Sequence, residues 1–484
     1  MALPWMWGMS YSRGYDFFLW VYNAWYLGES IGWGDLPNWS PYAACGQPFY
    51  KVAGLSDSAM LASLMQAAGV FGGLRIFVLL AYIVASVGLY QLARSLDLNR
   101  GAAWLAAAAY VMSWFLTFTV YFQAYLSNLL VYALLPWFVY WVRTSIAERA
   151  AGSLWAATAA LATCALANPQ VAIKIVLIGV WLTLPLMLRG SKWIWWGVWS
   201  GIGLVALTFV VFDVVSALRL RSEVLTINAR ANSYVGPFTL VAVPAFAFGL
   251  LNELLGGERR PGMELWELLY AEHPGLVAVV LAVMALVWER KIMVTLLWGG
   301  VAVGYALFFF VLPYLPASPW LGISHNIMIV PVFGLALLSG FGATALRYRL
   351  ILLWDERRAQ WASAAVAVLL AIEGYGLLMG LKQWGTSGIE PRDLPEVAVW
   401  KELAEPMRAD GGNTRFFTFN PDWTIGLFPV VTGLPTANVI ELRQRSADYQ
   451  AYLDLIVRCS KTPDCRIQPS RLLAPLNVSY VDVP

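Results

Sequence analysis

The stretch "YDFFLWVYNAWYLGESIGWGDLPNWSPYAACGQPF", residues 15–49, decides how the rest of the chain is interpreted. It carries the acids Asp16, Glu29 and Asp35 and is dense in Trp and Tyr. A membrane span needs about 20 largely apolar residues, so this stretch is too polar to cross a bilayer. Trp and Tyr prefer the membrane–water interface. We therefore expect an interfacial helix and loop at the membrane surface.

The composition of the chain is that of an integral membrane protein. Of its 484 residues, 60% are hydrophobic and 13% are charged, whereas a soluble protein has roughly 25% charged residues. The net charge of +3 (32 basic minus 29 acidic residues) gives no reason to expect nucleic-acid binding. Charge is therefore informative through its position along the chain.

Hydropathy predicts an all-α polytopic bundle with about ten spans. Two further apolar segments, 58–72 and 237–255, are short or interrupted by polar residues and prolines, and we expect re-entrant or interfacial helices there. The predicted spans are residues 74–94, 101–119, 125–142, 151–168, 171–188, 193–216, 275–289, 292–313, 327–346 and 362–382.

Basic residues gather in alternate loops, and the positive-inside rule assigns these loops to the cytoplasm. The opening loop, the loop 217–274 and all residues after 383 are then predicted to lie outside. An outside start implies either a first span missing from this chain or a loop that is translocated unaided. The basic residues are Arg94, Arg100, Arg143, Arg149, Arg189, Lys192, Arg290, Lys291, Arg347, Arg349, Arg357 and Arg358.

Three regions follow from this pattern: an outer first loop (1–57), a transmembrane bundle (58–383) and an extracytoplasmic α/β domain (384–484). In the last region, "TRFFTFN", "LFPVVTG" and "NVSYVDV" are predicted strands, and "SADYQAYLDLIVRC" is a predicted amphipathic helix. Cys459 and Cys465 lie there on the oxidising side, where a disulfide is expected and two free thiols are the alternative.

Asp16 is the strongest candidate for chemistry in the opening loop. It lies between Tyr15 and a run of aromatic and aliphatic residues. Aromatic surroundings at a bilayer surface would partly desolvate the carboxylate, raise its pKa and suit it to accept a proton. The alternative is a solvated acid within an ordinary aromatic belt.

Cations predicted on the outer side could hold a phosphate group. Arg219 and Arg221 follow a predicted span, and Lys174 lies just inside the outer end of another. The alternatives are lipid head-group contacts and a snorkelling lysine. Glu223 is a candidate second carboxylate, and His325 is either a phosphate contact or an ordinary polar residue.

The opening stretch resembles the first external loop of GT-C glycosyltransferases, above all the YfhO-like family. The shared pattern is an Asp followed by an aromatic helix, then Gly–x–Leu–Pro–x–Trp–x–Pro and Gly–x–Pro. Downstream, "GLYQLARSLDLNRGAAWLAAAAYVMSWF", "LLPWFVYWV" and "RLLAPLNVSYVDV" are also similar to the family. The matching residues of the opening loop are Gly34, Leu36, Pro37, Trp39, Pro41, Gly46 and Pro48.

Two motifs of the family are changed here. "ANPQVAI" resembles the family's His–Pro–Gln motif, with Asn168 in place of the His and Gln170 kept. "SHNIMIVPVFGLALLSGFGATAL" is similar to its Arg–x–Pro–x–Arg–Phe helix without the basic residues. These changes favour a second interpretation, in which the chain is a catalytically degenerate structural subunit of a membrane complex.

The resemblance implies a GT-C-like bundle that moves a sugar from a polyprenyl-phosphate carrier to an outer-face glycan, lipid or protein. Asp16 would be the general base, with Tyr15, Trp39, Asn168 and Gln170 among the substrate-binding residues. A divalent metal is neither excluded nor supported, since no ligand motif is visible. A transporter of lipid-linked sugars is the third interpretation.

Overall fold

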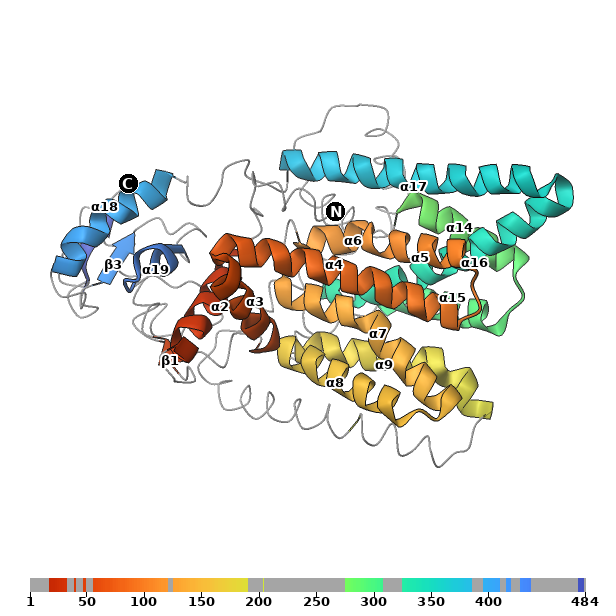
Figure 1. The fold of residues 1–484 in the computed structure, drawn as a ribbon, viewed down its shortest axis with the longest axis horizontal. Helices are drawn as coiled ribbons and strands as arrows, with labels where there is room; N and C mark the ends of the chain where they lie inside the picture. The colour runs from red at the N-terminus through yellow and green to blue at the C-terminus, as the bar shows by residue number, and fades with distance from the viewer. Residues whose placement is uncertain are drawn as a thin grey trace.

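The chain forms a bundle of long helices with a small mixed unit at one end, as Figure 1 shows. The structure is a computed structural model. It describes residues 17–32, 39–40, 47–48, 55–120, 125–189, 203, 275–307, 324–384, 395–409, 415–418, 427–436 and 478–482.

The opening stretch contains helix α2 (Phe17–Gly32), which is followed by helix α3 (Leu55–Ala68). Between them, β1 (Trp39–Ser40) pairs with β2 (Gln47–Pro48) in antiparallel register, Trp39 opposite Pro48. Gln66 of α3 donates a hydrogen bond from Nε2 to the Gly28 carbonyl of α2 at 3.2 Å. The two helices therefore pack together, and the short β1–β2 pair joins two parts of the opening motif.

The helices of the bundle confirm the prediction of a membrane protein. Three helices, α4, α7 and α16 with the turn before it, are long and apolar enough to cross a bilayer, and four shorter apolar helices accompany them within the described residues. The ten-span count stays a prediction. The helices are α4 (Val70–Ser95), α5 (Arg100–Val111), α6 (Trp114–Phe118), α7 (Leu126–Glu148), α8 (Ala151–Ala167), α9 (Pro169–Arg189), α14 (Leu276–Trp288), α15 (Ile292–Ala306), η6 (Ser324–Met328), α16 (Ile329–Leu353) and α17 (Glu356–Trp384).

The turns that carry the basic residues lie at one end of the bundle. In Figure 1 the α4–α5, α7–α8, α14–α15 and α16–α17 turns are all at the right, opposite α2, α3 and the C-terminal unit. Arg143 near the end of α7 donates from Nε to the Ser95 carbonyl at the end of α4, at 3.2 Å. We call this the inner end and the opposite one the outer end, following the predicted orientation.

Several predicted spans have different bounds in the structure, and two of them differ most clearly. Residues 101–119 are not one helix, because α5 ends at Val111 and α6 begins at Trp114. The Ser113 hydroxyl accepts a hydrogen bond from the Leu116 N–H at 3.3 Å and so caps α6. At the other extreme, α16 continues to Leu353, past the predicted end at 346. Apart from residue 203, the segments 193–216 and 237–255 lie outside the described residues.

Helix α16 is the centre of the bundle, and glycines allow its neighbours to approach closely. A β-carbon at Gly342 would overlap the Leu281 carbonyl of α14, and one at Gly334 would lie 2.8 Å from the Val301 side chain of α15. Only glycine fits at such contacts without a shift of the neighbouring helix. The start of α16 is thereby fixed against α15, which positions the candidate site described below.

The C-terminal unit contains α18 (Pro395–Ala409), β3 (Arg415–Thr418), α19 (Leu427–Thr432) and β4 (Val478–Asp482). Strands β3 and β4 are parallel, so "TRFFTFN" and "NVSYVDV" do form strands. The strand prediction for "LFPVVTG" is wrong, because this segment is the helix α19. The predicted helix 446–459 and Cys459 and Cys465 lie outside the described residues.

Tertiary packing explains why this segment is helical. As a helix, α19 stacks Phe428 on Phe416 of β3, with ring centroids 4.6 Å apart, and sets it edge-on to Trp400 of α18. On α19, Val430 packs against Leu19 and Tyr22 of α2. One short helix therefore closes the core of the C-terminal unit and joins it to the opening helix.

Candidate functional site at the outer end

The predicted site residues divide into those the structure describes and those it does not. Asn168, Gln170 and Lys174 are described with their side chains, whereas only the backbone is described for Trp39 and His325. The others lie outside the described residues: Tyr15, Asp16, Arg219, Arg221 and Glu223.

A chain of buried amides joins three parts of the outer end. Asn168, between α8 and α9, donates from Nδ2 to Oδ1 of Asn128 on α7 at 2.7 Å. Asn128 in turn donates from Nδ2 to Oδ1 of Asn326 in η6 at 3.0 Å, and the Tyr132 hydroxyl donates to the same oxygen at 3.2 Å. We call Asn128, Tyr132, Asn168 and Asn326 the amide cluster.

Local structure holds the amide cluster in place. The Asn168 carboxamide oxygen accepts a hydrogen bond from the Val171 N–H at 3.2 Å, which caps the start of α9. The Tyr110 hydroxyl of α5 donates to the Tyr132 carbonyl at 2.9 Å. Asn128 and Asn326 are each only 2% exposed. Because buried amides are stable only when hydrogen-bonded, the cluster fixes how α7, α9 and η6 meet.

The amide cluster occupies the two places where the sequence departs from the GT-C pattern. Asn168 stands where that pattern has a His, and Asn326 lies in the segment that has lost its basic residues. In the fold these positions, 158 residues apart, both contact Asn128. The two positions at which the sequence differs from the resembled pattern therefore meet at one place in the fold, where both amides bond to Asn128.

Lys174 lies close to this cluster on α9 and is 5% exposed. It is one helical turn after Gln170 and one turn before Ile178, so the three residues share a face of the helix. Ile178 and, one turn further, Trp181 and Leu182 line an apolar cavity. A buried lysine is unusual unless it is paired or functional, and here it lies on the same helix face as the cavity lining.

The cavity lies between α9, α15 and the start of α16 and has a volume of about 110 Å³. Its lining is almost entirely apolar and includes Ile327, the residue after Asn326 of the amide cluster. Trp181 is held at its edge by a hydrogen bond from Nε1 to the Leu296 carbonyl at 2.7 Å. A volume of this size accepts a short stretch of hydrocarbon and favours apolar ligands over water.

Asp57, at the start of α3, is a buried acid that the sequence analysis did not single out. It is 2% exposed, and burial raises its pKa well above the ordinary 3.8, although backbone N–H groups of Asp57 and Ser58 oppose the shift. The adjacent Ser56 hydroxyl donates to the Thr163 carbonyl of α8 at 2.8 Å. Asp57 therefore lies near the end of α8 that leads into the amide cluster.

Of the two residues that the sequence analysis missed, Asn128 and Asp57, only Asn128 carries a signal in the sequence. Asn128 is an amide within a predicted span, and a polar residue in a span is a candidate functional or structural site by default. Asp57 has no such signal, because an acid before an apolar segment is normally solvent-exposed. Within the described part of the chain, no group of three His, Cys, Asp or Glu side chains gathers as a metal site.

Comparison with known proteins shows which solved structures have a similar fold. No protein-family model matches the sequence, and no curated protein matches it by sequence. Among solved structures, it is similar to the arabinofuranosyltransferase AftD from Mycobacteria, with a TM-score of 0.51 and 16% identity, over 86% of this chain and 28% of AftD. It is also similar to the oligosaccharyltransferase of Archaeoglobus fulgidus, with a TM-score of 0.50 and 11% identity, over 98% of this chain and 64% of that protein.

Both of these proteins are membrane glycosyltransferases of the GT-C type, so the chain has the fold that the opening loop predicted. At such low identity the likeness establishes the fold alone. The chain spans less than two thirds of either protein, and membership of the YfhO-like family stays a prediction.

Proposed function

We propose that the chain is a glycosyltransferase that moves a sugar from a polyprenyl-phosphate carrier to an acceptor at the outer face of the membrane. The observation that carries the proposal is the arrangement on α9, where buried Lys174 shares a helix face with the lining of the apolar cavity. A cation on the same helix face as the lining of an apolar cavity suits a ligand with a phosphate head and a hydrocarbon tail. The GT-C fold supports the same reaction class.

In the proposed reaction, an acceptor hydroxyl attacks the anomeric carbon of the sugar. A new carbon–oxygen bond forms as the bond to the carrier phosphate breaks, and the phosphate leaves with the electron pair. Asp16 accepts the hydroxyl proton as general base. Asp16 is the residue before Phe17, at which α2 begins, and α2 packs against both α3 and the C-terminal unit.

Lys174 has the complementary role of stabilising the phosphate. Its ammonium group would offset the negative charge that the leaving group gains in the transition state. Arg219, Arg221 and His325 are proposed to add further contacts, and Glu223 is a candidate second carboxylate. The amides of Asn168 and Gln170 and the rings of Tyr15 and Trp39 are proposed to contact the sugar or acceptor, because amides bond to hydroxyls and rings stack on sugar faces.

A second function is favoured by one observation. The amide cluster stands at the positions where the resembled pattern has His or basic residues, and its amides bond to Asn128 instead of remaining open to a substrate. A chain that has lost catalysis but kept its fold would show such a change. The second candidate is therefore a non-catalytic subunit of a membrane complex.

The test is sugar transfer in proteoliposomes supplied with extracted polyprenyl-phosphate sugars. Replacing Asp16 by Asn keeps the shape of the side chain and removes the base, so transfer should fall by about 10²- to 10⁴-fold. Asp35→Asn is the matched control in the same loop and should retain transfer. Lys174→Met should lower kcat/KM for the donor more than Lys291→Met at the inner end, because the contact it removes is strongest in the transition state.

The outcomes separate the candidates. Equal transfer by wild type and Asp16→Asn would remove Asp16 from the mechanism. Loss with Asp35→Asn alone would assign the base to Asp35. No transfer by the folded wild-type protein with any donor, together with stable association with other membrane subunits, would favour the non-catalytic function.

A further inference from the structure

The turn between α16 and α17 projects beyond the other turns at the inner end. Gly340 of α16 lies against Leu98 and Ala102 at the start of α5, and the Lys291 ammonium at the start of α15 lies 5.6 Å from the centre of the Phe341 ring. Helix α16 then continues for 12 residues past Phe341, to Leu353. Figure 1 shows the α16–α17 turn further out than the α4–α5 turn.

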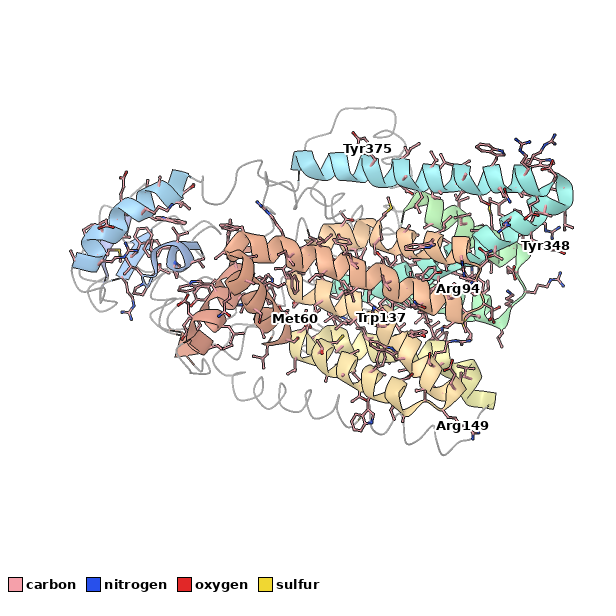
Figure 2. The ribbon with its side chains drawn as sticks, viewed as in Figure 1. Met60, Arg94, Trp137, Arg149, Tyr348 and Tyr375 are labelled. Carbon is pink, nitrogen blue, oxygen red and sulfur yellow. The ribbon has the colours of Figure 1, made fainter. Side chains whose placement is uncertain are left out.

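This projecting hairpin, residues 347–361, exposes large apolar and aromatic side chains. It lies between the two predicted spans 327–346 and 362–382, which places it at the level of the lipid head groups. Figure 2 shows Tyr348 at the right-hand, inner end of the molecule, near the α16–α17 turn. The exposed fractions are 64% for Tyr348, 63% for Leu352, 73% for Leu353, 55% for Trp354 and 69% for Trp361.

The hairpin also carries a surplus of positive charge. Arg347 pairs with Glu356 at 3.2 Å, and Arg358 pairs with Asp355 at 3.5 Å. Arg349 and Arg357 are exposed and make no ion pair with any residue that the structure describes. Four arginines against two acids leave a net charge of +2, which resides on these two side chains.

We propose that the hairpin is a binding site for anionic phospholipid head groups of the inner leaflet, with Arg349 and Arg357 as the phosphate contacts. The guanidinium group binds phosphate through two parallel hydrogen bonds. Trp354 and Trp361 lie at the interface, and Leu352 and Leu353 contact the adjacent acyl chains. Apolar and basic groups side by side are what an anionic membrane surface requires.

The hairpin is rigid, which favours a specific lipid site over a diffuse attraction. The Asp355 carboxylate accepts a hydrogen bond from the Arg358 N–H at 2.7 Å and caps α17, so the reversal takes only two residues, Trp354 and Asp355. The two helical ends therefore fix the backbone positions of Arg349 and Arg357. The site lies at the opposite end of α16 from Asn326, so it can fail independently of the proposed glycosyltransferase function.

The experiment measures lipid binding to the purified full chain in a zwitterionic detergent. Phosphatidylglycerol and phosphatidylcholine are titrated separately, and bound lipid is counted by native mass spectrometry. We expect preferential binding of phosphatidylglycerol, which the double variant Arg349→Ala/Arg357→Ala should weaken by about 30-fold. Arg349→Lys/Arg357→Lys keeps the charge and should recover most of the affinity.

The matched control is Arg100→Ala/Arg290→Ala. It removes the same charge from two exposed arginines on the recessed turns of the same end. An equal loss of affinity in both double variants would overturn the proposal and leave only a diffuse positive field. Equal binding of the two lipids to the wild type would also overturn it. A protein partner that binds this hairpin through Arg349 and Arg357 instead of lipid would overturn it as well. A thermal midpoint unchanged in phosphatidylcholine shows that each variant is folded.

Discussion

Two buried polar regions at the outer end differ in how their hydrogen bonds are satisfied. In the amide cluster, Asn128, Asn168 and Asn326 bond to one another across 198 residues of sequence. In the α2–α3 pair, five buried side-chain atoms have no hydrogen-bond partner in the described part of the chain. These atoms are Trp20 Nε1, Asn23 Nδ2, Ser30 Oγ, Asp57 Oδ1 and Ser58 Oγ.

The difference in hydrogen bonding suggests different roles for the two regions, one in stability and one in function. Folded proteins have only a few unsatisfied buried polar atoms per 100 residues, whereas the two helices together have 16 + 14 = 30 residues and five such atoms. A buried polar group without a partner costs stability, and functional sites are where proteins retain such costs. The amide cluster therefore links α7, α9 and η6, and we predict that the α2–α3 pair is the region where a functional requirement limits stability.

The largest effect should come from exchanging a single amide in each region for leucine. Asn128→Leu removes the acceptor of the half-buried Asn168 Nδ2 and the donor to the buried Asn326 Oδ1, so the free energy of unfolding should fall by about 2–3 kcal/mol. Asn23→Leu removes an amide that is equally buried but has no partner in the described residues, and stability should stay level or rise by about 1 kcal/mol. Denaturant titration of both variants in the same detergent measures the contrast.

A similar loss of stability in both leucine variants would contradict this comparison. It would mean that Asn23 has a partner as effective as that of Asn128. The Asn128→Asp variant serves as a further control, because it keeps the acceptor for Asn168 while removing the donor to Asn326.

A smaller effect, with a defined pH dependence, should follow from replacing Asp57 by Asn. Burial raises the folded-state pKa of Asp57 well above 3.8, so the folded protein binds the proton more tightly than the unfolded chain. Wild-type stability should therefore fall as pH rises from about 3.8 through the folded-state pKa, and then level off. Asp57→Asn lacks this loss and should be more stable at neutral pH by about 1–2 kcal/mol.

The measurement is the difference in thermal midpoint between Asp57→Asn and wild type from pH 4 to pH 8. The difference should grow with pH. Asp97→Asn is the control, since Asp97 is an exposed acid at the inner end, and its difference should be small at every pH. A midpoint difference for Asp57→Asn that stays constant with pH would show that the carboxyl does not titrate between these states.

Hydropathy predicted apolar helices in the described part of the bundle, and charge predicted that its basic turns share one end, because both patterns depend on local composition. Which side of the membrane this end faces stays a prediction. The break at Ser113 was missed because the residues on either side of this hydroxyl are apolar, so a window average does not register the cap. The segment "LFPVVTG" was predicted as a strand from its short alternating pattern, but burying Phe428 against Phe416 favours a helix.

The candidate site was less predictable than the fold. Lys174 could be found from sequence because a lysine in an apolar span is conspicuous. The pairing of Asn128 with Asn168 and Asn326 could not, since contacts across 40 and 198 residues leave no periodic signal. Asp57 was missed for the same reason, because its burial depends on the packing of α3 against α2 and α8.

The smallest effect should come from the contact between the C-terminal unit and α2. Val430→Ala removes methyl groups that pack against Leu19 and Tyr22, which should cost about 0.5–1 kcal/mol because the valine is only partly buried. Hydrogen exchange of α2 should then accelerate while that of α7 stays unchanged. The control Val399→Ala lies on an exposed position of α18, 51% accessible, and should leave both rates unchanged. If α2 exchanges no faster in Val430→Ala, the C-terminal unit does not stabilise the opening helix. In that case packing against the transmembrane bundle alone would stabilise α2 and α3 and their unpartnered buried groups.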